Sequence, residues 1–203
     1  MRGHDCAGAA GGDAGAVALK PETYFRWADY PPSARRARSV GAVKTRVVVS
    51  PDGQPVRCDV LIPTKDPILN TATCDLLLKR SRYTPARDAD GNQAFGTVER
   101  ITIWSSDKPL TPASSADFEL RLSKMPSGAK AREGFKLLLA TDVEGAIGTC
   151  AAENDVTLPA LVTIACRHVA AAGKLDPARD RDGKPVAAIQ ELTVAFVLDQ
   201  PAP

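Results

Sequence analysis

The chain contains two pairs of cysteines with the same spacing. Cys58 and Cys74 lie 16 residues apart, and Cys150 and Cys166 repeat that spacing 92 residues later. Other identities keep the same offset without a gap: Pro-Ala-Arg-Asp at 85–88 and 177–180, Asp-Gly at 90–91 and 182–183, and Gly53/Gly145, Pro67/Pro159, Leu69/Leu161, Thr71/Thr163 and Glu99/Glu191. We interpret this register as a tandem duplication, which has to be recognised before any fold is assigned. The 203 residues are enough for two units of about 100 residues, each able to bury a core.

The first unit is predicted to contain a short helix followed by the order β-β-α-β. Residues 43–49 and 56–62 alternate between apolar and polar side chains on either side of the turn Ser50-Pro51-Asp52-Gly53, a pattern typical of a hairpin. Asp66-Pro67 is typical of a helix N-terminus, and we expect this helix to run to about Arg82. The last strand is expected at 98–104, with Ile101 and Ile103 facing the helix.

The second unit repeats this order less clearly, with strands expected at 135–141, through Cys150 and at 192–198, and a helix at about 158–172. The predicted fold class is therefore α+β: two tandem units, each a short helix followed by β-β-α-β, with a three-stranded antiparallel sheet packed on one helix. We place a flexible Gly- and Ala-rich segment at 1–20, unit 1 at 22–104, a polar linker at 105–116 and unit 2 at 117–199.

The four paired cysteines are predicted to form the disulfides Cys58–Cys74 and Cys150–Cys166. Zinc sites usually place two ligands two to four residues apart, and redox dithiols use Cys-x-x-Cys; neither spacing occurs here. Each pair instead joins the second strand of a hairpin to the following helix. Disulfides persist in oxidising compartments, so the pairs indicate the periplasm or the cell exterior. Cys6 is left without a partner.

Composition and motifs disfavour several classes of function. The net charge of +2 argues against a nucleic-acid binder, and no apolar stretch approaches 18 residues, so no transmembrane segment is expected. His4 and His168 are the two histidines, and the chain lacks a Gly-x-Ser-x-Gly motif, a phosphate-binding glycine loop and a metal-ligand cluster. The Asp-x-Asp-Gly stretches at 88–91 and 180–183 are interpreted as hairpin turns rather than calcium loops. We therefore expect no enzymatic activity, cofactor, metal or small-molecule substrate.

Unit 1 resembles the TonB C-terminal domain, the periplasmic tip of the energy transducer that drives outer-membrane receptors. The resemblance covers about residues 28–104 and depends on Tyr30-Pro31-Pro32, Gly41, Asp52-Gly53, Leu69 with Ala72, and Tyr83-Thr84-Pro85-Ala86. Unit 2 lacks the Tyr-Pro entry and has Leu175 in place of the aromatic residue, as in a degenerate copy. A transducer of this family would also have a membrane anchor and a Pro-rich spacer. Neither is visible, so we expect the chain as given not to couple to an inner-membrane motor.

The resemblance implies a periplasmic peptide-binding domain involved in energy-dependent transport across the outer membrane. Its partner would be the periplasmic segment of a receptor, added as a strand to the edge of the sheet. The expected partner-binding residues lie on the last strand of unit 1, with Arg100 and Trp104 tuning specificity: Thr97, Val98, Arg100, Thr102 and Trp104. The alternative is a stand-alone periplasmic structural or adaptor protein without an energy-transducing role. The sequence upstream would separate the two, since an anchor with a spacer favours the first and a plain signal peptide the second.

Overall fold

The computed structural model describes residues 13–105, 116–130, 132–154 and 158–199. In unit 1 the elements follow in the order α1 (Pro32–Arg36), β2 (Gly41–Val49), β3 (Pro55–Ile62), α2 (Pro67–Arg80), β4 (Tyr83–Thr84), β5 (Ala86–Arg87) and β6 (Gln93–Trp104). Unit 2 contains β7 (Phe118–Leu122), β8 (Arg132–Thr141), β9 (Ile147–Ala152), α3 (Pro159–Ala172) and β10 (Ala188–Leu198). The protein has a mixed α+β fold, as predicted. Ten of the twelve residues expected in the linker, 106–115, lie outside the described residues.

Local sequence signals explain the hairpin and the helix of unit 1. Gly53 takes a φ of 79° in the turn between β2 and β3, a conformation that favours glycine. Asp66 is the N-cap of α2, and its carboxylate accepts a hydrogen bond of 3.0 Å from the N–H of Ile68. A disulfide joins Cys58 on β3 to Cys74 on α2, with 5.5 Å between the Cα atoms. The helix is thereby attached to one end of the sheet.

Unit 2 has the same order of sheet and helix elements but begins differently. A disulfide joins Cys150 on β9 to Cys166 on α3, with 5.8 Å between the Cα atoms. The short helix expected at the start of each unit occurs only in unit 1 among the described residues, because unit 2 begins with the strand β7 instead. Phe118, Leu120 and Leu122 alternate along β7 and pack on the core beside α3, which favours a strand here.

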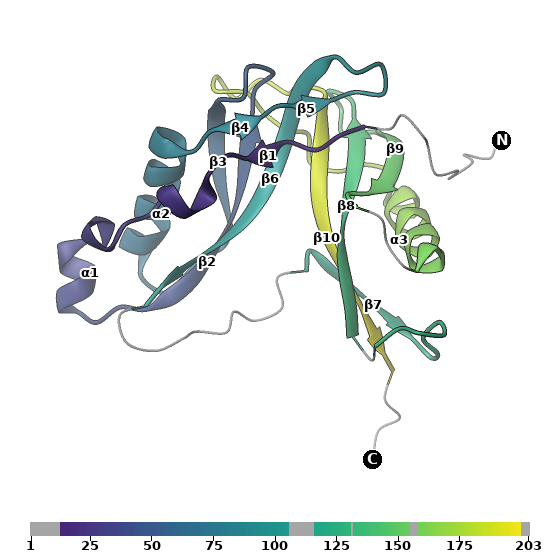
Figure 1. Cartoon of the computed structure of the whole chain (residues 1–203), viewed down its shortest axis with the longest axis horizontal. Helices are drawn as coiled ribbons and strands as arrows, with labels where there is room; N and C mark the ends of the chain where they lie inside the picture. The colour runs from purple at the N-terminus through teal and green to yellow at the C-terminus, as the bar shows by residue number, and fades with distance from the viewer. Residues whose placement is uncertain (1–12, 106–115, 131, 155–157, 200–203) are drawn as a thin grey trace.

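The three-stranded sheets of the two units are joined, an arrangement that was not predicted from the sequence. They join into one sheet with the strand order β3-β2-β6-β10-β8-β9, to which β5 and β7 add at β6 and β10. The connection is the parallel pairing of β6 with β10, limited to Phe95 with Ala188 and Gly96 with Ile189. Figure 1 shows the two strands side by side at their N-terminal ends and diverging toward their C-terminal ends.

The helices α2 and α3 cover opposite faces of this sheet. Paired residues of neighbouring strands project from the same face, so Gly96 and Ile189 share a face. Ile189 packs in the cluster that contains Leu77 of α2. Leu192, which lies on the other face of β10, packs in the cluster that contains Leu161 of α3. In each unit, the face of the sheet opposite the unit's own helix is therefore available for other contacts.

Residues 13–20, expected within a flexible segment, are ordered against both units. β1 (Val17–Ala18) pairs antiparallel with β4, and Ala14 exchanges two backbone hydrogen bonds of 2.9 and 2.8 Å with Arg87. Figure 1 shows this segment crossing the sheet from β4 toward β9. Its small side chains gave no periodic signal, because the segment is held by backbone pairing and by close contacts rather than by an apolar stripe. The residues before Asp13 lie outside the described part.

Gly53→Ala is expected to lower the free energy of unfolding by about 2 kcal/mol or more. A Cβ atom at Gly53 would lie 2.2 Å from the carbonyl oxygen of Tyr83, in addition to the strain of a left-handed backbone. Gly91 is the matched control, since its φ is 83° but nothing lies within 4 Å of a Cβ placed there. Gly91→Ala should lower the free energy of unfolding by only about 1 kcal/mol, the cost of a left-handed backbone at a residue with a Cβ atom. Equal urea midpoints for the two variants would show that the approach of Tyr83 carries no cost.

Candidate functional site

One side of β6 lacks a partner strand over most of its length. The opposite side is paired with β2 from Gly96 with Val49 to Trp104 with Gly41. The other side pairs with β10 only at Phe95 and Gly96, and no further strand adjoins it from Thr97 onward among the described residues. We call this side of residues 97–104 the β6 edge.

Alternate backbone groups of the β6 edge point away from β2. The N–H of Glu99 donates a hydrogen bond of 3.4 Å to the carboxylate of Glu191 on β10, so it is directed outward. In an antiparallel pair the direction of the backbone groups alternates from residue to residue. Ile101 and Ile103 therefore also present their N–H and C=O groups outward, where an additional strand could pair.

The side chains of the predicted binding residues are mostly covered. Thr97 is buried and its hydroxyl accepts a hydrogen bond of 2.9 Å from the N–H of Glu191. Val98 packs on the cluster beneath α2, and Thr102 is buried on the same face of the sheet. The guanidinium carbon of Arg100 lies 5.6 Å from the ring centroids of both Tyr24 and Phe25.

Trp104 is the most firmly held residue of this group. Its indole N–H donates a hydrogen bond of 2.8 Å to the hydroxyl of Thr73 on α2, and its ring meets those of Phe25 and Tyr30 edge-on. The structure thus contradicts the expectation that Ile101 and Ile103 face the helix: Ile103 is 47% exposed, whereas Trp104 is 5% exposed. Burying Trp104 together with Val98 removes more apolar area from water than burying two isoleucines.

The corresponding edge of unit 2 is occupied. β7 pairs in parallel with β10 from Phe118 with Val194 to Leu122 with Leu198. Just before β7, the N–H of Asp117 donates to the carbonyl of Thr193 and the carboxylate of Asp117 accepts from the N–H of Thr193, both at 2.7 Å. The chain itself therefore adds a strand at the edge of unit 2, and the β6 edge has no such strand among the residues described.

The family-model comparison bears on the region that carries this edge. The model of the Gram-negative bacterial TonB protein C-terminal family matches residues 28–105. These residues form a TonB C-terminal domain. No curated protein and no solved structure is significantly similar to the chain. The match confirms the resemblance of unit 1, with boundaries close to those the motifs predicted; it does not extend to unit 2.

The family match indicates a general role for residues 28–105. TonB C-terminal domains act in transport at the envelope of Gram-negative bacteria, in the periplasm and without catalysis, and the family suggests outer-membrane receptors as partners. The two disulfides of the structure are consistent with an oxidising compartment. Of the helices within the described ranges, none has the length and apolarity needed to cross a membrane.

Buried ion pairs lie where the TonB C-terminal domain meets unit 2. Nζ of Lys44 lies 2.7 Å from the carboxylates of both Glu99 and Asp117, and a guanidinium nitrogen of Arg46 lies 2.9 Å from Glu99. Burial raises the pKa of Glu99 above its usual value, although Lys44 opposes the shift. Because Asp117 immediately precedes β7, these contacts anchor the start of unit 2 to the domain.

A second ion pair occurs at the same offset of 92 residues. Nζ of Lys136 lies 2.8 Å from the carboxylate of Glu191, which is 2% exposed. Burial raises the pKa of Glu191 to about 7, and the ion pair with Lys136 only partly offsets this effect. Glu99 and Glu191 stand out in the repeat of the sequence, whereas their lysine partners were not predicted. Lys44 and Lys136 are also 92 residues apart, and this shared offset was the available signal.

Proposed function

We propose that the TonB C-terminal domain at residues 28–105 binds an extended periplasmic segment of an outer-membrane receptor by strand addition at the β6 edge. The observation that carries this proposal is the unpaired side of β6 beyond Gly96 in the described part of the chain. In strand addition the backbone hydrogen bonds supply the affinity, and the flanking side chains supply the specificity. The periplasm is the compartment in which this partner would be met.

The covered side chains modify the role expected for individual residues. Arg100 and Trp104 lie under residues 21–30 and α2, so they hold the edge in place from behind. We assign the direct side-chain contacts to Ile101 and Ile103 instead, because Ile101 is partly exposed and Ile103 is 47% exposed on the other face. An apolar residue of the receptor segment would pack beside them.

We also propose that unit 2, at 117–199, is a diverged second copy of the domain that no longer accepts a strand from outside. Support comes from the shared order of its sheet and helix elements, from its disulfide at the same 92-residue offset, and from β7 on its edge. Its role would be structural, since β10 continues the sheet beside β6.

Ile103→Pro is expected to weaken receptor-peptide binding by more than about tenfold. Proline removes the outward N–H of residue 103 without removing a hydrogen bond to β2, so the sheet itself should persist. The measurement is amide-shift titration of the full chain with synthetic peptides from the periplasmic segments of outer-membrane receptors of the same genome. Shifts should be concentrated at residues 97–104.

Ile103→Ala is the matched control, because it shortens the same side chain but keeps the N–H. It should bind within about threefold of the unaltered protein if the backbone dominates the affinity. Shifts confined to unit 2, an unaffected β6 edge at saturating peptide, or equal affinities for the two variants would each contradict the proposal.

A further inference from the structure

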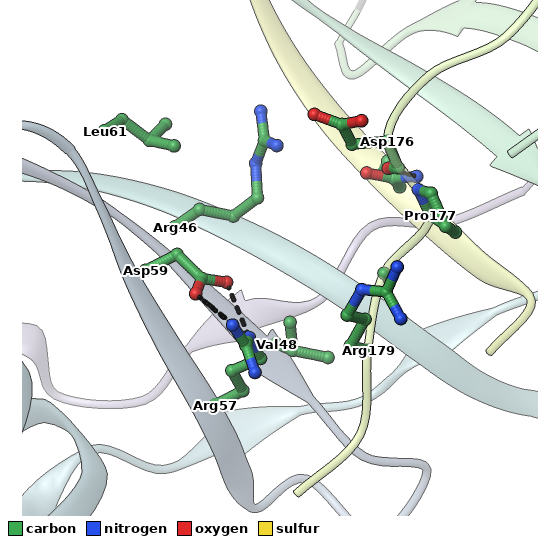
Figure 2. Close-up of a pocket in the computed structure, with 10 residues that line it drawn as sticks. Arg46, Val48, Arg57, Asp59, Leu61, Asp176, Pro177 and Arg179 are labelled. Atoms are coloured by element: carbon green, nitrogen blue, oxygen red, sulfur yellow. Dashed lines mark hydrogen bonds and ion pairs between the residues drawn. The ribbon is translucent and has the colours of Figure 1, made fainter. Parts of the chain in front are cut away.

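A cleft lies away from the β6 edge, between the face of unit 1 opposite α2 and a loop of unit 2. It encloses about 260 Å³. Its walls are residues of β2 and β3 on one side, and of β10 and the loop before it on the other: Arg46, Val48, Arg57, Asp59 and Leu61, and Asp176, Pro177, Ala178, Arg179 and Gln190. Figure 2 shows Asp176, Pro177 and Arg179 across the space from the Arg57–Asp59 pair. We call it the arginine groove.

Three arginines and two aspartates, Asp59 and Asp176, line the arginine groove, so its own side chains leave one positive charge unbalanced. Asp59 is already paired with Arg57 at 2.8 Å. Arg46 donates to the buried Glu99 through one terminal nitrogen, while its Nε is buried and has no hydrogen-bond partner. Arg179 donates to the carbonyl of Gly183 and forms no ion pair within the described residues. The groove is therefore suited to an anionic group.

The matching position on the other side of the sheet is already filled by an extended segment of the chain. At an offset of 92 residues, Arg46, Arg57 and Arg179 correspond to Leu138, Thr149 and Arg87. Residues 13–18 lie there. Gly15 is so close to Leu138 that a Cβ atom would meet its side chain at 2.8 Å, and the hydroxyl of Thr149 donates to the carboxylate of Asp13.

The backbone at the two positions has the same orientation. On one side, the N–H and C=O of Arg87 pair with Ala14 at 2.8 and 2.9 Å. Arg179 lies in a similar hairpin, because Asp180 bonds to Lys184 and Val186 bonds to Ala178, as Asp88 bonds to Asn92. Its own N–H and C=O point outward, and within the described part of the chain the N–H donates no hydrogen bond and the C=O accepts none. One side holds a paired peptide segment, and the other offers the same backbone groups unpaired.

We propose that the arginine groove binds an extended acidic peptide segment of a partner protein, paired with the backbone of Arg179 and directing a carboxylate toward Arg46 and Arg179. The acidic character follows from the exchange of residues between the two positions. Leu138, the apolar residue on which Gly15 lies, is replaced in the arginine groove by Arg46. Thr149, which binds Asp13, is replaced there by Arg57. Guanidinium groups bind carboxylates in a bidentate manner, so an acidic side chain fits better than a small one. This site is separate from the β6 edge and does not depend on it.

The probe for the test is the synthetic hexapeptide Asp-Ala-Glu-Ala-Val-Ala, which follows residues 13–18 but has Glu at the place of Gly15. We expect saturable amide shifts at β3 and at residues 176–179 of the full chain. A peptide with Gln in place of Glu should bind at least about fivefold more weakly, and binding of the Glu peptide should weaken with added salt. Shifts at residues 84–87 and Leu138 would instead mean that the probe displaces the chain's own segment, which would overturn the proposal.

Arg179→Gln should reduce the affinity for the Glu peptide by about fivefold or more, since it removes one guanidinium but keeps the backbone pairing. Arg46→Gln provides a second variant on the opposite wall. Arg121→Gln is the matched control, because Arg121 lies on β7, is 67% exposed and does not line the groove. Equal affinity of Arg179→Gln and Arg121→Gln, or no preference for the Glu peptide over the Gln peptide, would refute the assignment. Ile103→Pro should leave this binding unchanged.

Discussion

Raising the pH from 4.5 to about 7 is expected to lower the free energy of unfolding by roughly 3 kcal/mol through Glu191, whose pKa burial raises from 4.5 to about 7. Between these values the carboxyl group holds its proton in the folded chain but has lost it in the unfolded chain. The unfolded state then binds fewer protons, so stability falls as the pH rises. The raised pKa of Glu99 acts in the same direction. Urea unfolding at a series of pH values measures the slope.

Glu191→Gln should remove most of this pH dependence, because the amide cannot ionise and fills nearly the same volume. Glu153→Gln is the control. Glu153 also lies near Lys136, with 3.9 Å between the charged atoms, but its side chain is 26% exposed. Glu153→Gln should leave the change of the free energy of unfolding over the same pH range unaltered within about 0.5 kcal/mol. Parallel curves for the unaltered protein and Glu191→Gln would show that Glu191 titrates normally.

Replacing both Cys58 and Cys74 with alanine is expected to lower the free energy of unfolding by about 3 kcal/mol, the value of the chain-entropy model for a loop of this length. The pair Cys150 and Cys166 closes a loop with the same separation of 16 residues, so the entropic term should be equal. Cys166 is 2% exposed and lies in the core beneath α3. Its replacement should therefore cost more than that of the first pair, through lost packing.

Cys6→Ala is the control for these double variants, because it removes a cysteine that belongs to neither disulfide. Alkylation under native conditions gives an independent measurement. The five cysteines of the chain include the four in disulfides, so no more than one thiol should react before reduction. Five reactive thiols in protein from an oxidising compartment, or peptides that join the two units, would contradict the pairing.

Local elements of this fold were predictable because their signals are local. The Pro-Asp-Gly turn, the Asp66 N-cap and the repeated cysteine spacing all act within about 20 residues, and each element appears close to its expected position. The face of β6 was not predictable in this way. Val98 and Trp104 project from one face of the strand, and Ile101 and Ile103 project from the other. Because both pairs are apolar, the alternation alone does not tell which face packs on the helix. Only the position of Thr73 and the aromatic residues at 25 and 30 decides between them.

The contacts between the units could not be predicted from periodicity. The pairing of β6 with β10 involves two residue pairs from strands about 92 residues apart, and neither strand carries a signal for its neighbour. The β7 strand did have a readable alternation at Phe118, Leu120 and Leu122. Residues 13–18 had none, since a segment of Gly, Ala and Val gains its order from the partners that it meets. The side chains of β6 that face the helix were therefore misassigned, and the binding role of this strand stays a prediction.

The path of residues 13–18 has a consequence for how the chain unfolds. The same short segment bonds to Arg87 and Thr84 of unit 1 and contacts Leu138 and Thr149 of unit 2. One apolar cluster also contains Leu77 and Val47 from unit 1 together with Leu138 and Ile189 from unit 2. Neither unit can lose its structure without exposing apolar surface of the other. Two units that share a core in this way are expected to melt in one cooperative transition, with thermodynamic stability belonging to the pair and not to either unit.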